Sequence, residues 1–230
     1  MTTNWLLEAA RNNAEWCDVM CRAHGLTGAF GPRVWSSPVR TPMYYPDAVT
    51  LDPAATAGEA LAGIDAGDWA SIKDSFAAFD ELPGFEVLFE AEWIHRDPPT
   101  ESAVDGDLVW GPVRDPDELR AWELAWSGGH DQELFKAALL DDVSVVRGRT
   151  AEGEIVCGAV LNASGEVVGV SNVFASGREL DEAWAGVLAM AVRLFPRRPL
   201  VGYETETATA LRHGFTAIGP LRVWLNEGAG

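Results

Sequence analysis

The stretch VVGVSNVFASGRELDEAWAGVLAMAVRLF (residues 167–195) joins a predicted strand to a predicted helix, and it decides the fold of the second half of the chain. Its first nine residues are mostly small or β-branched, as in a buried strand. Helix starts attract anions because their first N–H groups are unpaired, so the turn between the two elements is a candidate phosphate site. Acidic residues at this turn are also what an ordinary helix start prefers. Apolar residues then recur at helical spacing, at Leu180, Trp184, Val187, Leu188, Ala191 and Phe195.

The sequence on both sides of this stretch predicts a regular series of elements from residue 107 onward. Gly-containing turns separate three successive strand candidates and favour antiparallel pairing of neighbours. A proline after Asp115 is typical of the first helical position. The expected elements are a strand at 107–113, helices at 115–126 and 130–140, strands at 143–149, 153–162 and 165–175, a helix at 179–195, a strand at 199–203, a helix at 207–214 and a strand at 215–225.

The first half of the chain is less regular. Its expected elements are a helix at 5–25, strands at 28–37 and 46–52, helices at 57–64 and 68–79, and a strand at 85–95. The polar, proline-bearing segment 95–107 is the best linker candidate, so we expect an N-terminal α/β unit at 1–106 and a second domain at 107–230. GFEVLFEAEW (84–93) and GFTAIGPLRVW (214–224) share a pattern that suggests a duplicated fold, with chance as the alternative.

Composition limits the classes of function. The 230 residues carry a formal net charge of -18, which disfavours nucleic acid and anionic membrane surfaces and favours a cationic or amine substrate. The apolar runs are shorter than a bilayer span, and the start lacks a basic region followed by an apolar one. We therefore expect a cytoplasmic protein with no nucleic-acid or membrane partner, and a homodimer stays open beside a monomer.

Three cysteines are too few and too scattered for a disulfide framework, so we expect reduced, buried thiols. The alternative is a metal site, because Cys17, Cys21 and His24 lie at i, i+4 and i+7 of one helix. Since no fourth ligand is visible, we expect no metal.

The second half resembles the GCN5-related N-acetyltransferase (GNAT) superfamily. Three features carry the resemblance: the strand VVGVSNVFA (167–175), the helix that follows it, and LRHGFTAIGPLRVW (211–224), which is similar to the final helix, glycine-phenylalanine turn and last strand. The resemblance implies an α/β (α+β) fold with a mixed, mostly antiparallel sheet flanked by helices. It also implies that residues 1–106 are a degenerate, truncated repeat of that fold.

The resemblance further implies an acyl-CoA-dependent N-acyltransferase that moves an acyl group from acetyl-CoA or another acyl-CoA to a small amine. The central strand would carry a bulge and bind the donor's pantetheine arm, and the turn after it would bind the diphosphate. The cofactor-binding residues implied in this way are Val170, Ser171, Asn172, Val173, Phe174, Ser176, Gly177, Arg178 and Ala183.

The sequence departs from the family pattern at two positions. The signature (Q/R)xxGx(G/A), read from Arg178, has Asp181 in place of its glycine, which adds a side chain and a negative charge where a diphosphate would lie. Two unit charges about 4 Å apart repel by about 1 to 4 kcal/mol at the dielectric of water or a protein surface. Ala210 stands where active relatives often have a tyrosine that protonates the leaving thiolate.

Candidate catalytic residues follow the strand at 199–203. Glu204 is the preferred general base, with Glu206 and His213 as alternatives, and Tyr203 can supply a hydroxyl. Trp35, Tyr44 and Tyr45 lie in or beside a proline-rich loop and are candidates to bind substrate. Two other hypotheses remain open: a non-catalytic GNAT-fold binding or regulatory protein that does not bind coenzyme A, and an enzyme of another class on the same scaffold.

Overall fold

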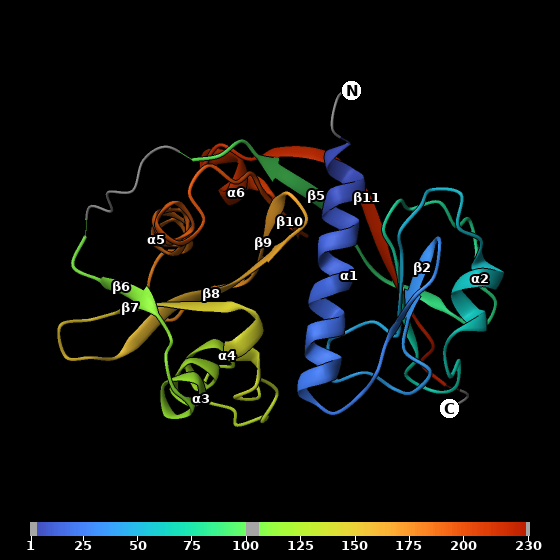
Figure 1. The fold of residues 1–230 in the computed structure, drawn as a ribbon, viewed down its shortest axis with the longest axis horizontal. Helices are drawn as coiled ribbons and strands as arrows, with labels where there is room; N and C mark the ends of the chain where they lie inside the picture. Colours follow the sequence, from blue (N-terminus) through green and yellow to red (C-terminus); the bar gives the residue numbers. More distant parts are fainter. Residues whose placement is uncertain (1–3, 100–105, 229–230) are drawn as a thin grey trace.

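The strands form one sheet that runs through the whole molecule (Figure 1). The computed structural model describes residues 4–99 and 106–228. Within these residues the sheet has eleven strands in the order β1-β2-β3-β4-β11-β5-β10-β9-β8-β7-β6. The strands are β1 (Ala29–Phe30), β2 (Val34–Ser36), β3 (Ala48–Thr50), β4 (Ser71–Asp74), β5 (Glu86–Arg96), β6 (Val109–Pro112), β7 (Ser144–Arg149), β8 (Ile155–Ser164), β9 (Val167–Ala175), β10 (Leu200–Glu204) and β11 (Thr216–Leu225).

The two sides of this sheet share one strand topology, read outward from its centre. On one side β5 pairs antiparallel with β10, β10 parallel with β9, and β9, β8 and β7 antiparallel in turn. On the other side β11 pairs antiparallel with β4, β4 parallel with β3, and β3, β2 and β1 antiparallel in turn. The segments 84–93 and 214–224 contribute these two central strands, which pair with each other from Thr216–His95 to Leu225–Glu86. Each half of the chain therefore places its long strand beside the strands of the other half.

Helices cover both faces of the sheet. In Figure 1, α1 crosses the middle of one face, and α3 and α4 lie beside it. Successive residues of β5 show the two faces, because Trp93 packs with Ala9 and Ala10 of α1 while Ile94 packs with Trp184 of α5. The α2 helix covers the same face as α5, with Ala60 against Ile72 of β4. The helices are α1 (Trp5–Ala23), α2 (Ala57–Ala62), α3 (Pro116–Trp126), α4 (Leu139–Asp142), α5 (Leu180–Leu194) and α6 (Ala208–Arg212).

Local sequence explains where the main helices begin. The Asn4 side chain accepts a hydrogen bond from the Leu7 N–H at the start of α1. Asp115 does the same for Glu118 at the start of α3, with Pro116 at the first helical position. The order of elements expected after residue 107 is confirmed, including the antiparallel series β7, β8 and β9.

Two expected helices are wrong. Residues 68–79 form no helix, because Ser71–Asp74 is β4, buried between β3 and β11 in the middle of the sheet. Sheet pairing there overrides a short pattern that fits a helix as well as a strand. Residues 130–138 are irregular and contain turns, and the only helix there is α4, Leu139–Asp142. The buried carboxylate of Glu123 accepts hydrogen bonds from the N–H groups of Leu134 (2.7 Å) and Phe135 (3.4 Å), which holds this segment out of a helix.

Candidate functional site

The sheet opens between β9 and β10. The two strands pair only at Val168–Leu200 and Gly169–Val201. Further along, β9 keeps β8 as its neighbour and β10 keeps β5. Among the described strands, none fills the wedge between them, so backbone N–H and C=O groups on the facing edges can pair with a ligand.

A bulge in β9 lies beside this wedge. Gly158 and Val160 of β8 pair with Phe174 and Ser171, so β9 carries one extra residue between the two pairs. Asn172 lies in the bulge with a φ of 55°, in the left-handed region that Asn tolerates better than most residues. The expected bulge is therefore present, and it turns the side chains of β9 at the wedge.

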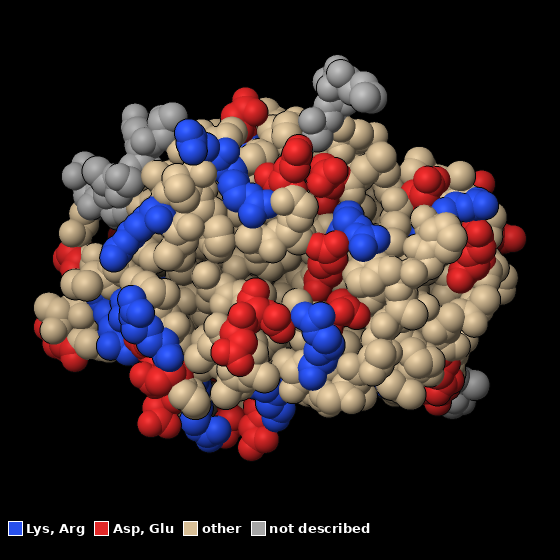
Figure 2. All heavy atoms as spheres, viewed as in Figure 1, with Lys and Arg blue, Asp and Glu red and all other residues tan. Residues whose placement is uncertain are grey.

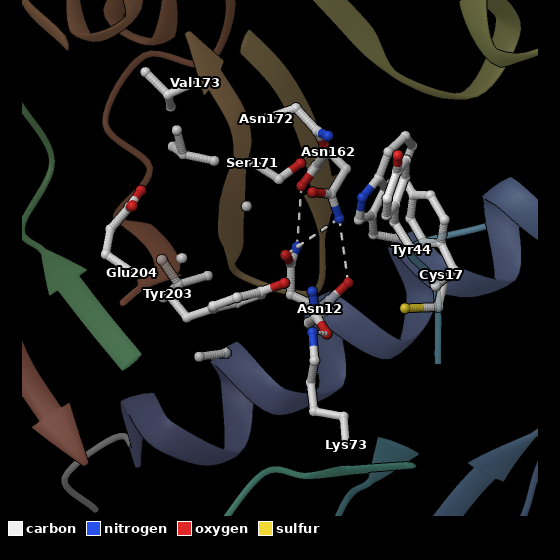
Figure 3. A pocket seen from close by; sticks show the side chains of 18 of the residues that line it. Asn12, Cys17, Tyr44, Lys73, Asn162, Ser171, Asn172, Val173, Tyr203 and Glu204 are labelled. Carbon is white, nitrogen blue, oxygen red and sulfur yellow. Dashed lines mark hydrogen bonds between the residues drawn. The ribbon is translucent and has the colours of Figure 1, made fainter. Parts of the chain in front are cut away.

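A cavity of about 290 Å³ lies at the wedge, beside α1 (Figure 3). Ser171 points into it, and its Oγ is buried with no hydrogen-bond partner among the described residues. An unpaired buried hydroxyl is costly, so it is available to a ligand amide or carbonyl group. The expected site residues that line this cavity are Tyr44, Tyr45, Val170, Ser171, Asn172, Val173, Tyr203 and Glu204.

Two expected site residues lie in the core instead. Trp35 is fully buried, and its indole N–H donates to Asp18 Oδ1 at 3.0 Å. Phe174 packs edge-to-face on Trp122, with 5.3 Å between the ring centroids. Neither residue lines the cavity at the wedge, because both side chains point into the layer between the sheet and the helices α1, α3 and α4.

Glu204, at the end of β10, has the most perturbed carboxyl group of the site. Burial raises its pKa from 4.5 to about 7, because the charged form loses solvation. A carboxyl with this pKa can gain and lose a proton near neutral pH, as a general base must. The other two candidates lie apart from the cavity: Glu206 is exposed, and His213 Nε2 lies 3.1 Å from Asp181 Oδ1.

Tyr203 and Lys73 form the floor between this cavity and the adjoining apolar one. The Lys73 ammonium lies 4.0 Å from the centre of the Tyr203 ring and donates to Asn13 Oδ1 at 2.8 Å. The same ring packs edge-to-face against Trp93, at 5.5 Å between centroids. These contacts fix the Tyr203 side chain against α1, while its neighbour Glu204 faces β9 across the wedge (Figure 3).

A pair of asparagines holds α1 against the sheet at the back of the cavity. Asn12 donates to the Asn162 carbonyl oxygen at 3.0 Å and to Ser164 Oγ at 2.8 Å. Asn162 donates in return to the carbonyl oxygen and Oδ1 of Asn12, both at 3.2 Å (Figure 3). Gly169 lets this contact form, because a Cβ there would lie 2.0 Å from Asn12 Oδ1. The pair fixes the height of α1 above the wedge.

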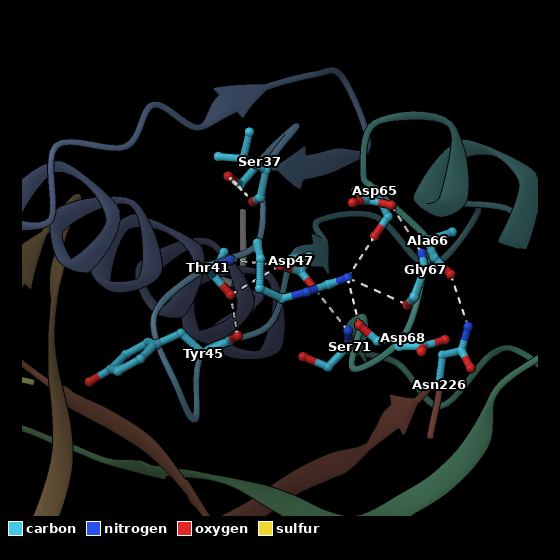
Figure 4. A network of polar contacts seen from close by, with 12 residues as sticks. Ser37, Thr41, Tyr45, Asp47, Asp65, Ala66, Gly67, Asp68, Ser71 and Asn226 are labelled. Atoms are coloured by element: carbon cyan, nitrogen blue, oxygen red, sulfur yellow. Dashed lines mark hydrogen bonds and ion pairs between the residues drawn. The ribbon is translucent and has the colours of Figure 1, made fainter. Parts of the chain in front are cut away.

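A buried network holds the loop that carries Tyr44 and Tyr45 (Figure 4). Asp47 is 1% exposed, and its carboxylate accepts from the N–H groups of Thr41 and Ser71, both at 2.9 Å. Arg40 forms an ion pair with the same carboxylate and also donates to backbone carbonyl groups of residues 65–68. The network ties the loop to β4 and so positions both tyrosines at the cavity.

Solved structures share this architecture over the whole chain. A GCN5-related N-acetyltransferase from Kribbella flavida matches with a TM-score of 0.61 over 96% of both chains, at 14% sequence identity. A protein from Novosphingobium aromaticivorans assigned to the GNAT family of acetyltransferases matches with a TM-score of 0.57, over 94% of this chain and 97% of that one, at 16% identity. The chain has the GNAT fold.

A functionally unknown conserved protein from Staphylococcus epidermidis also matches, with a TM-score of 0.56 over 70% of this chain and 73% of that one, at 13% identity. No known sequence family and no curated protein matches the chain. The likeness is therefore one of fold.

In this GNAT fold, ion pairs occupy the turn between β9 and α5. Arg178 forms a two-pronged pair with Asp107, at 2.8 and 3.1 Å, and approaches Glu182 at 3.5 Å. Asp181 pairs with Arg212 at 2.5 Å and with the His213 ring. Hydrogen bonds from these partners lower the pKa of both Asp107 and Asp181, so the turn keeps its negative charges. Of the other residues implied at this turn, Ser176 and Gly177 lie in it, and Ala183 is fully buried against Val156 and Cys157.

Three residues that line the cavity, Asn12, Asn13 and Lys73, were not selected from the sequence. Asn12 and Asn13 interrupt the apolar face of the first helix, and two adjacent amides on a buried face are a usable signal. Lys73 lies within residues 68–79, for which the sequence predicts a helix. The place of Lys73 at the cavity follows only from the pairing of β4 with β3 and β11, which no local pattern in the sequence shows.

The described residues contain no group of three or more His, Cys, Asp or Glu side chains arranged to hold a metal ion. His24 Nε2 contacts the Leu134 carbonyl oxygen at 2.7 Å, and Cys17, Cys21 and Cys157 are buried free thiols. No helix in the described part of the chain is long and apolar enough to cross a bilayer. On the face in Figure 2, Lys and Arg side chains lie among Asp and Glu side chains rather than in one basic stripe.

Proposed function

We propose that the protein is an N-acyltransferase that transfers an acyl group from a pantetheine thioester, such as that of acetyl-CoA, to a small amine. The observation that carries the proposal is Glu204, whose pKa of about 7 suits a general base at the open wedge of a GNAT fold. The free edges of β9 and β10 and the unpaired Ser171 hydroxyl can bind the amide groups of a pantetheine arm.

The reaction assigns one proton transfer to each of two neighbouring side chains. The amine nitrogen attacks the thioester carbonyl carbon, the new C–N bond forms, and Glu204 accepts the proton that the nitrogen loses. When the C–S bond breaks, the Tyr203 hydroxyl donates a proton to the thiolate and later regains one from Glu204 through solvent. Tyr203 takes this part because the position usual for a tyrosine is Ala210, which is buried in the core.

The turn after β9 fits a diphosphate poorly. Both arginines near it already bind carboxylates: Arg178 binds Asp107, and Arg212 binds Asp181. An incoming diphosphate would have to displace these partners and would meet the charge of Asp181 at the helix start. The pantetheine part of a donor therefore has a better site here than the diphosphate part.

These ion pairs also favour a second candidate function. A chain that closes its own anion site with carboxylates can serve as a small-molecule binding or regulatory protein without coenzyme A. In that case Glu204 and the cavity bind a ligand and no acyl group is transferred.

Titration calorimetry with acetyl-CoA and with S-acetylpantetheine tests the donor. Saturable binding of both is expected, and binding of neither would refute the acyltransferase and leave the binding protein. Asp181→Asn removes one charge at roughly equal size. It should raise acetyl-CoA affinity about fivefold, which corresponds to about 1 kcal/mol for one exposed charge pair, and should leave S-acetylpantetheine unchanged.

Steady-state acylation of a panel of amines tests the base. Glu204→Gln should lower kcat/KM by about 10² to 10⁴, the usual contribution of a general base. Glu152→Gln makes the same chemical change in an exposed turn far from the cavity and should leave the rate unchanged. A Glu204→Gln enzyme with undiminished kcat/KM would exclude Glu204 as the base.

A further inference from the structure

A second cavity, of about 720 Å³, adjoins the first. The two share a wall, made by Tyr44, Tyr45, Pro46, Lys73 and Tyr203. The volume is within the range of small-molecule sites. A ligand in the second cavity would therefore lie next to the proposed reaction site.

The outer wall of this second cavity is apolar and exposed. Among the described residues, ten large apolar side chains remain exposed, and four of them line this one cavity: Met43 (66%), Tyr44 (66%), Trp69 (65%) and Leu88 (52%). Apolar side chains gathered at a hollow indicate a binding surface, whereas single exposed ones do not.

Two of these four residues have strained backbone. Tyr44 has a φ of 72° and Trp69 a φ of 65°, in the left-handed region that bulky residues rarely adopt. Strain of this kind persists where the surroundings impose it, and it gathers at ligand-binding segments. Here the Asp47 network imposes it, because Arg40 ties the loop of Tyr44 to backbone carbonyl groups of residues 65–68, next to Trp69.

At the inner end of the cavity lies a buried cation without a carboxylate partner in the described structure. Lys73 is 3% exposed, and its ammonium contacts the neutral Asn13 amide and the Tyr203 ring. Lysine is seldom buried unless its charge is paired. One donor of the ammonium goes to Asn13, so others remain for a ligand in the cavity.

The nearby carboxylates are bound to other groups. Asp74, the next residue of β4, accepts from the N–H groups of Phe76 and Phe79. Asp47 binds Arg40, and Glu90 of β5 binds Arg222 at 2.7 Å. The charge of Lys73 is therefore left for an anion that comes from outside.

We propose that the amine acceptor carries a carboxylate, which binds Lys73, and a large apolar group, which fills the second cavity. An amino acid with a large apolar side chain has this chemistry. The amine of this ligand rests on the proposed function. The carboxylate and the apolar group do not, because their contacts with Lys73 and the second cavity need no acyl transfer.

Binding without a donor tests the site independently of catalysis. Titration with 4-phenylbutyrate and with 4-phenylbutan-1-ol should show the acid binding at least tenfold more tightly. Lys73→Met should reduce this preference to within about twofold, and Lys73→Arg, which keeps the charge, should retain most of it. Equal affinity of the wild type for the two probes, or a preference that survives Lys73→Met, would overturn the carboxylate site.

The apolar part is tested by a charge at the cavity mouth. Leu88→Asp should weaken both probes about tenfold or more. Val109→Asp, at an apolar position of the edge strand β6 that is exposed to a similar degree, should change neither. Unchanged binding to Leu88→Asp would remove the second cavity from the proposal.

Acyl transfer separates this inference from the proposed function. With a bound donor, L-phenylalanine should be acylated with a higher kcat/KM than 2-phenylethylamine. Acid-selective binding with acylation of neither amine would refute the acyltransferase and keep the site. Faster acylation of 2-phenylethylamine, together with no acid preference, would keep the acyltransferase and refute the site.

Discussion

Replacing Glu204 by glutamine should stabilise the protein above neutral pH. The pKa of this carboxyl is about 7 in the folded protein and 4.5 without burial, so the folded state binds more protons than the unfolded state between these values. The free energy of unfolding of the wild type therefore falls as pH rises from about 4.5 to about 7, and the whole cost is present above pH 7. At 1.36 kcal/mol per pKa unit the cost is at most about 3 kcal/mol. Because Glu204 lies at the cavity mouth and is partly hydrated, we expect 1 to 3 kcal/mol.

Urea unfolding of wild type and Glu204→Gln at pH 5 and pH 8 measures the cost of burying the charged Glu204 carboxyl. The variant should be more stable at pH 8 by 1 to 3 kcal/mol and should differ much less at pH 5, where the wild-type carboxyl is mostly protonated. Glu152→Gln, in an exposed turn, removes a carboxylate with no burial and serves as the control. A Glu204→Gln variant that is equally or less stable at pH 8 would show that the carboxyl is not desolvated and would weaken its part as a base.

Three other substitutions test how the site is built. Asp47→Ala leaves Arg40 and the loop of Tyr44 and Tyr45 without their buried partner, so it should cost about 3 to 5 kcal/mol in urea unfolding, as breaking a buried ion pair does. Asp80→Ala is the exposed control, and a loss under about 1 kcal/mol for Asp47→Ala would contradict the network. Gly169→Ala places a methyl group 2.0 Å from Asn12 Oδ1, so it should cost about 1 to 3 kcal/mol and widen the wedge. The same change at Gly58, where the nearest atom to the new methyl group is Thr56 Oγ1 at 4.0 Å, should cost little. Asn172→Val forces a β-branched residue to a φ of 55° and should lower the free energy of unfolding by about 1 to 2 kcal/mol. Asn172→Gly should leave it unchanged, because glycine adopts this φ without strain. Equal stability of these two variants would argue against a strained bulge.

Most strands and helices of the second half could be predicted because each carries its own pattern, the helix expected at 130–140 being the exception. In β9 and α5 the apolar spacing changes from strand to helix within a few residues, and Gly177 marks the turn. Glu204 and Tyr203 could be selected because they end a short buried strand. The signal for these elements is local, and so the sequence contains it.

Other parts of the site depend on contacts between distant segments. Lys73 and Asn13 are 60 residues apart, and Asn12 and Asn162 are 150 apart, so no local pattern shows that either pair meets. Trp35 was expected at the site because it precedes an aromatic, proline-rich loop, but the side chain turns inward to Asp18. The helix expected at 68–79 was wrong for the same reason, since its strand pairing is with β11, almost 150 residues later.

Each half of the chain contributes one long strand, β5 or β11, to the other half's side of the sheet, and this has a consequence during synthesis on the ribosome. β4 leaves the ribosome early, yet its neighbour β11 is the last of the described strands to emerge. Until then the nascent chain holds an open strand edge at β4, and such edges invite pairing with other chains. We expect the N-terminal sheet to stay incomplete until translation reaches residues 216–225, so that chains arrested before β11 depend on chaperones far more than the finished protein does.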